Sequence, residues 1–152
     1  MDRVKIGAIT VGQAPRTDVT ADILPLLGDC QLLERGGLDG LSRQEIAAFA
    51  PEPGDYVLVS RLADGSSVTF AEKHILPRTQ QAIADLEAQG CRLSAVFCTG
   101  DFPDIFHSKA PLAFPNRILQ GVAPTLTASG KIGVVTPSPL QLEHSKRKWE
   151  KY

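Results

Sequence analysis

The sequence has none of the features that mark membrane, secreted or nucleic-acid-binding proteins. No apolar run is long enough to cross a bilayer, and the N-terminus has a strand pattern instead of the basic, apolar and small-residue layout of a signal peptide. The 16 Lys and Arg residues are balanced by 17 Asp and Glu residues, with no basic stripe. We therefore expect a cytoplasmic protein that binds neither membrane nor nucleic acid. The one charge run, Lys146-Arg147-Lys148, is typical of a solvated helix face.

Several chemical signatures are also missing. The three cysteines form no C-x-x-C pair, which argues against a disulfide framework and a structural zinc site, so we expect no metal. No G-x-G-x-x-G follows the first apolar run, and the fingerprint of dinucleotide binding is therefore absent. Neither a Ser-His-Asp nor a papain-type Cys-His signature is present. The common nucleophile and cofactor motifs thus do not identify a function.

What the sequence does contain is the pattern of an α/β protein. Its 152 residues suffice for one core, and length alone predicts a single domain. Capping boxes predict helix starts at Ser42 and at Thr69, the second helix running to Gly90, and Asp64-Gly65 predicts a tight turn between strands. Alternating strands and helices predict a parallel sheet flanked by helices. Expected strands are 4–11, 30–34, 56–62, 92–97 and 131–137, and further helices are 19–27, capped by Thr17 or Asp18, 118–127 and 140–152.

Cys98 is the first candidate for chemistry. It follows the apolar run after Gly90, and ligands of open α/β sheets bind outside the carboxyl ends of the strands. The alternative is a buried cysteine that acts as a small core hydrophobe. A helix start at Pro103 would lower the pKa of the thiol, whereas Asp101 and Asp104 would oppose ionisation. Cys91 lies seven residues before Cys98, about 23 Å away in an extended chain, and Cys30 begins another strand, so neither is placed to share a substrate atom with Cys98.

Three further side chains have both a functional and a structural interpretation. Arg16, at the carboxyl end of the first strand, has a guanidinium that can bind a carboxylate or phosphate through two hydrogen bonds, or it is an exposed surface arginine. Arg61 lies near the end of the third strand and points either to the crevice or to water. His107 is either an acid–base partner or a surface histidine.

Four segments together resemble the AroM family. The Gly-Gln-Ala-Pro-Arg turn is the most specific of them, and the resemblance runs along nearly the whole chain. The segments are Thr10-Val11-Gly12-Gln13-Ala14-Pro15-Arg16, Gly40-Leu41-Ser42, Leu62-Ala63-Asp64-Gly65 and Lys131-Ile132-Gly133-Val134-Val135-Thr136-Pro137.

The resemblance implies a fold and a chemistry. AroM proteins are similar in fold to the aspartate/glutamate/hydantoin racemase superfamily and are discussed near shikimate and aromatic amino-acid metabolism. Those racemases use no cofactor: two cysteines, one from each of two similar halves, face opposite sides of the substrate's α-carbon. Cys98 matches the cysteine of the first half, so the resemblance implies that Cys98 is the catalytic residue for a small carboxylate-bearing molecule. The residues expected to bind that molecule are Thr10, Gly12, Gln13, Arg16, Arg61, Thr99, Gly100 and Thr136.

The second half of such a pair is expected to be truncated here. The resemblance implies a Rossmann-like, racemase-like first α/β domain over 1–128 and the start of a second over 129–152, without its cysteine. Either the chain is a fragment of a longer protein or it is a shortened relative that has lost racemisation. Its last strand and helix would expose apolar surface, which favours a homo-oligomer. Three hypotheses remain: a cofactor-independent racemase or isomerase, a non-catalytic carboxylate-binding or regulatory protein, and a dimerising structural domain.

Overall fold

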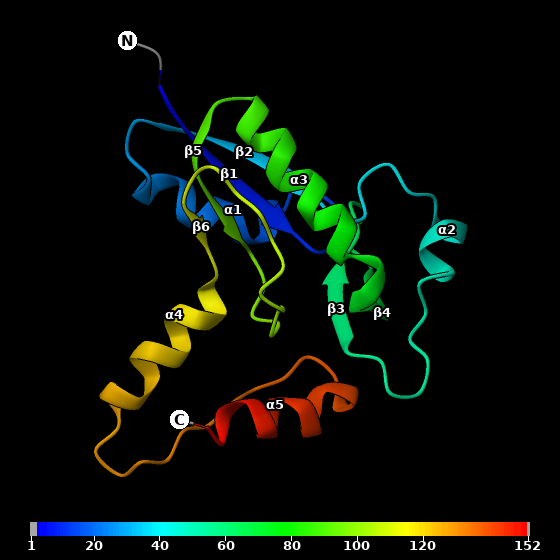
Figure 1. Ribbon diagram of the computed structural model, residues 1–152, viewed down its shortest axis with the longest axis vertical. Helices are drawn as coiled ribbons and strands as arrows, with labels where there is room; N and C mark the ends of the chain where they lie inside the picture. The colour runs from blue at the N-terminus through cyan, green and yellow to red at the C-terminus, as the bar shows by residue number, and fades with distance from the viewer. Residues whose placement is uncertain (1–2, 152) are drawn as a thin grey trace.

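The computed structural model describes residues 3–151 and has a parallel sheet flanked by helices (Figure 1). The sheet has the strand order β2 (Cys30–Gly36), β1 (Val4–Thr10), β5 (Cys91–Val96), β6 (Leu112–Ala113). All three neighbouring pairs are parallel. Helix α3 (Leu76–Ala88) packs across β1, β2 and β5. The predicted α/β class is therefore confirmed.

The hydrophobic core lies between α3, the central strands and a separate two-stranded hairpin. Ile9 of β1 and Val96 of β5 meet Ile83 and Leu86 of α3, and all four are fully buried. The burial of β1 is continuous only in its second half, and that of β5 is interrupted at Leu93, which is exposed. This packing holds the carboxyl ends of the two central strands side by side.

The hairpin corrects one helix prediction. Strands β3 (Val57–Arg61) and β4 (Ser67–Ala71) pair antiparallel across the predicted Asp64-Gly65 turn. The segment expected to open a helix at Thr69 is therefore a strand, because Phe70 is fully buried and pairs with Leu58 of β3. A 3₁₀ turn at Glu72–His74 follows, and α3 begins only at Leu76.

The predicted strand 131–137 is also wrong. None of these residues is in a strand; residues 131–135 and 137 are exposed, and Thr136 is half-buried. Apolar β-branched residues form a strand only where a neighbouring backbone accepts and donates hydrogen bonds, and no strand of the described chain pairs with this run. The fourth position of the sheet is taken by β6, which is not among the strands predicted from the sequence.

The bounds of the remaining helices, with their 3₁₀ turns included, agree with the predicted bounds to within about one helical turn. The Ser42 capping box is confirmed, with Glu45 as its partner. Thr17 and Asp18 lie inside their helix instead of capping it, and Arg16 occupies the cap position, where its side chain makes no capping hydrogen bond. The helices are α1 (Thr17–Ile23) with a 3₁₀ turn at Leu24–Leu26, α2 (Arg43–Ala47), α4 (Pro115–Val122) with a turn at Ala123–Leu126, and α5 (Leu142–Trp149) after a turn at Pro139–Gln141.

The C-terminal helix α5 lies beside the hairpin, below the carboxyl ends of the central strands in Figure 1. Gln141 Nε2 donates to the Val57 carbonyl at 2.9 Å, and the His144 ring packs against the Tyr56 ring at 4.0 Å between centroids. Apolar side chains near this segment remain exposed, Val135 among them at 97%. Self-association and the division near residue 128 both stay predictions. Within residues 3–151, no helix is long and apolar enough to span a membrane.

Candidate functional site

Cys98 lies just past the carboxyl end of β5, as predicted. The Phe97 amide still donates to the Ile9 carbonyl of β1 at 2.7 Å, and after it the chain turns so that the Gly100 amide donates to Cys98 Sγ at 3.3 Å. A Cβ at position 100 would lie 3.1 Å from Leu58 Cδ2 and 3.4 Å from Sγ, so glycine lets the loop close over the thiol. The expected helix start at Pro103 is absent.

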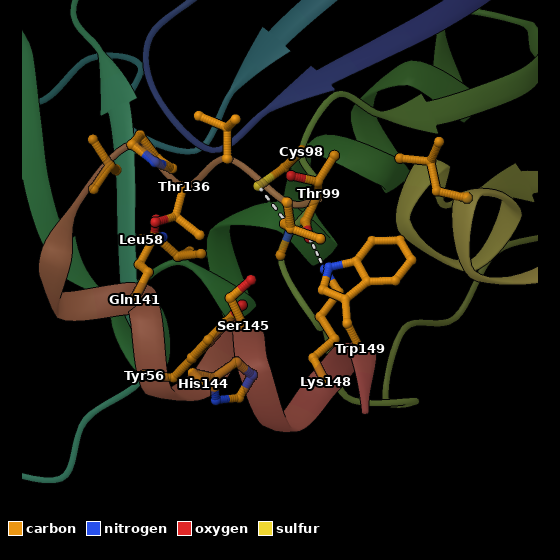
Figure 2. A pocket seen from close by; sticks show the side chains of 16 residues that line it. Tyr56, Leu58, Cys98, Thr99, Thr136, Gln141, His144, Ser145, Lys148 and Trp149 are labelled. Atoms are coloured by element: carbon orange, nitrogen blue, oxygen red, sulfur yellow. Dashed lines mark hydrogen bonds between the residues drawn. The ribbon is translucent and has the colours of Figure 1, made fainter. Parts of the chain in front are cut away.

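Two cavities meet at Cys98. We call the first the α5 cavity: it measures about 250 Å³, and Cys98, Thr99, Gly100, Thr136 and Lys148 are among its lining residues (Figure 2). We call the second the Arg16 cavity: it measures about 750 Å³ and is lined by Arg16, Arg61, Cys98 and Thr99 among others. Cys98 and Thr99 therefore form part of the wall of both.

The surroundings of the thiol act on its ionisation in opposite directions. Burial raises the pKa of Cys98, and the nearby Glu72 carboxyl adds to this effect. The hydrogen bond from the Gly100 amide and the ammonium of Lys148 lower that pKa. Because burial is the largest contribution, the resting group is a neutral thiol with a cation and an amide in place to stabilise its thiolate.

Arg16 is held differently from the sequence prediction. Its Nε and Nη2 donate to the two carboxylate oxygens of Asp18 at 2.7 and 2.8 Å, and this pairing lowers the pKa of Asp18. Nη1 donates to Thr10 Oγ1 and Ser60 Oγ, both at 3.3 Å. Arg61 Nε lies 3.8 Å from the same Asp18 carboxylate. The fork expected to bind a ligand carboxylate thus already binds a carboxylate of the protein.

Three of the residues predicted to bind the ligand line neither cavity. Buried Thr10 Oγ1 accepts hydrogen bonds from Arg16 and from the Gly12 amide. Gln13 joins three loops: its Nε2 donates to two main-chain carbonyls at 3.4 Å, and its Oε1 accepts from the Ala63 amide at 2.8 Å. These groups therefore shape the turn that carries Arg16. His107 is exposed and bonded through its backbone to Gln80, as the structural interpretation held.

Lys148 is the residue that sequence reasoning missed. Its charge run was expected on a solvated face, yet Lys148 is only 7% exposed, and its Nζ donates to the Thr99 carbonyl at 2.6 Å (Figure 2). Burial lowers the pKa of this ammonium group. Residues 141, 144, 145 and 148 lie on one face of a helix by their spacing, and this was the available signal.

Two carboxyl groups, those of Glu72 and Asp101, lie close enough to interact electrostatically, and Glu72 also acts on Cys98. Glu72 Oε1 is buried and has no hydrogen-bond partner in the described chain. Burial, with the charge of Asp101 added, raises the pKa of Glu72 to about 7. The Asp101 amide donates to the Tyr56 hydroxyl at 3.0 Å, and burial raises the pKa of Tyr56 to about 12. The Cys98 loop is thus bordered by a carboxyl group that holds its proton near neutral pH.

Glu72 should make the stability of the protein depend on pH. Its pKa is about 7 in the folded state and 4.5 as an ordinary glutamate, so between these values the folded state binds more protons. The free energy of unfolding must therefore fall as pH rises through this window and level off above it. Because the side chain is only half-buried, we expect Glu72→Gln to remove about 1 kcal/mol of this loss. Urea denaturation at about pH 5 and about pH 8 measures it, with exposed Glu143→Gln as the control. An unchanged pH dependence in Glu72→Gln would contradict the assignment.

Comparison with known proteins identifies a family. A family model, AroM protein, matches residues 6–152. Neither the curated proteins nor the solved structures include a match to this chain. Within residues 3–151, no group of three or more His, Cys, Asp or Glu side chains is placed to hold a metal ion.

Proposed function

We propose a function from the premise that this chain belongs to the AroM family. The protein binds a small carboxylate-bearing molecule beside Cys98 and exchanges the proton on the carbon next to that carboxylate. One observation carries this proposal: Cys98 lies at the carboxyl end of a central strand, in the wall shared by two cavities, with Arg16 in one and Lys148 in the other. A base with cations nearby is what removal of a proton from such a carbon requires.

The proposed step is a proton transfer without oxidation or reduction. The Cys98 thiolate takes the α-proton and becomes a thiol, and the electron pair of the broken C–H bond delocalises into the ligand carboxylate. A cation beside that carboxylate stabilises the added charge. The thiol then returns a proton, or exchanges it with solvent first. Inversion of the carbon centre is not part of the proposal.

The test is α-proton exchange in D₂O, followed by proton NMR. The panel comprises amino acids, hydantoins and shikimate-pathway acids, each incubated with the folded wild-type protein. We expect the α-proton signal of at least one class to disappear at a rate well above that without protein. Absence of exchange for every compound would refute the proposed chemistry.

A second function, non-catalytic binding of a small carboxylate, has one observation in its favour. The pKa of Cys98 is raised by burial, which disfavours the thiolate that catalysis needs. Isothermal titration calorimetry with the same panel separates the two. Binding without exchange, unchanged in Cys98→Ser, would favour the binding protein.

A further inference from the structure

Lys148 is a buried cation that forms no ion pair with the described residues, although the charge of Asp101 partly opposes the lowering of its pKa. It is 7% exposed, and its one hydrogen bond within the described chain goes to the neutral Thr99 carbonyl. None of the ion pairs among residues 3–151 includes it, whereas Lys73 and Lys146 each face a carboxylate. A charge removed from water without a counter-charge is destabilising. Lys148 therefore lies where an anion from outside the chain would compensate it.

The α5 cavity provides space for that anion. Lys148, Thr136 and Ser145 line it together with Cys98, and Figure 2 shows their side chains converging on it from α5 and from the two loops. Its volume of about 250 Å³ exceeds several times the roughly 30 Å³ that a water occupies in the liquid. A small organic carboxylate fits within this space.

One polar atom of the same cavity wall has no hydrogen-bond partner among the described residues. His144 lines the cavity, and its Nε2 is buried without a hydrogen bond to any described residue. Buried ring nitrogens are normally hydrogen-bonded in folded proteins. Both observations concern α5, and neither depends on the chemistry of Cys98.

We propose that Lys148 is the carboxylate-binding cation and that the ligand's anionic group lies in the α5 cavity beside Cys98. Arg16, the cation expected from the sequence, has both donors of its fork bonded to Asp18. Lys148 has two N–H groups left beyond its bond to Thr99. The inference rests on the proposed function only in its ligand class, a small carboxylate. It does not depend on the proposed proton transfer.

Two alkylating reagents test this site through Cys98 itself. Iodoacetate and iodoacetamide are nearly equal in size, and each is attacked by a thiolate that displaces iodide and forms a thioether, but only iodoacetate carries a carboxylate. We compare the iodoacetate-to-iodoacetamide rate ratio at Cys98 with that of free N-acetylcysteine, using peptide mass spectrometry to resolve each cysteine. One favourable charge interaction should raise the ratio at Cys98 about tenfold above the free thiol.

Variants then identify the cation. Lys148→Met is expected to return the ratio to that of the free thiol. Lys146 is on the same helix but is exposed, and its Nζ lies 3.9 Å from Glu150 Oε1. Lys146→Met should therefore leave the rate ratio unchanged. If Lys148 acted only on the ionisation of the thiol, both rates would fall together at constant ratio, and the proposal would be wrong.

Other outcomes also decide the question. A wild-type ratio equal to that of N-acetylcysteine overturns the proposal even if Lys148→Met fails to fold, as does a Cys98 that neither reagent labels in the native protein. Arg16→Met could instead return the rate ratio at Cys98 to that of the free thiol. This result would assign the anion to the Arg16 cavity. A raised ratio that depends on Lys148, in a protein without α-proton exchange, would refute the proposed chemistry and leave the anion site standing.

Discussion

Cys98→Ser is expected to lower the rate of α-proton exchange by about 10²–10⁴-fold, the usual contribution of a positioned base. A serine hydroxyl has almost the shape of the thiol and can still accept the hydrogen bond that the Gly100 amide gives to Sγ. Its pKa is far above that of a thiol, so the anionic base is no longer formed. The variant thus changes the chemistry and not the geometry, and proton NMR in D₂O with the most active compound of the panel measures the loss.

Cys30→Ser is the matched control. Cys30 is half-buried at the start of β2, at the end of the strands opposite to Cys98 in the parallel sheet. The same substitution there should leave the exchange rate at the wild-type value. Retention of exchange in Cys98→Ser would show that another group removes the proton. Loss in both variants would indicate a general effect on folding, which circular dichroism detects.

The position of Cys98 could be predicted because its signals are local. An apolar run that begins after a glycine and stops at a small polar turn identifies a buried strand and its end. The parallel arrangement then places that end beside the end of the first strand, and the structure pairs Ile9 with Val96 as this requires. The Ser42 capping box was correct for the same reason, since all its hydrogen bonds join residues three apart.

The burial of Lys148 and the pairing of Arg16 with Asp18 are contacts that such reasoning did not predict. Lys148 belongs to a charge run that any surface helix could carry. It is buried in a segment whose Gln141 contacts Val57 and whose His144 contacts Tyr56, more than 80 residues away along the chain. Arg16 was correctly placed at the strand end, but Asp18 was assigned to capping. The pairing of Asp18 with Arg16 depends on the directions of both side chains in the turn, and residue types alone do not specify these directions.

The errors in the fold also have a tertiary origin. Thr69 to Glu72 has the spacing of a capping box, but burial of Phe70 against Leu58 outweighs a capping contribution of about 1 kcal/mol. The run 131–137 has the composition of a strand and no partner strand in the described chain. Local preference decides neither segment, because a strand is stabilised by its neighbours.

Gly12→Ala is expected to destabilise the fold by about 3 kcal/mol, at the upper end of the usual cost of overpacking. Gly12 is buried where the β1 turn meets the hairpin, and a methyl group there would overlap the Arg61 carbonyl oxygen and Ser60 Oγ. The Arg61 oxygen belongs to the main chain and accepts a hydrogen bond from the Gln13 amide at 3.1 Å, so it cannot rotate away. The turn and β3 must therefore separate, and urea denaturation measures the loss in the free energy of unfolding.

Gly133→Ala is the control for this substitution. An added Cβ at Gly133 meets no atom within 4 Å, and its backbone is outside the conformations that favour glycine, so we expect a change within about 0.5 kcal/mol. Equal stability of the two variants would contradict the packing argument. If the packing argument is correct, the separation of the turn from β3 in Gly12→Ala also moves Ser60 away from Arg16 Nη1. The pairing of Arg16 with Asp18 is then loosened. The Gly-Gln-Ala-Pro-Arg turn then fixes Arg16 against the hairpin, in the wall of the Arg16 cavity.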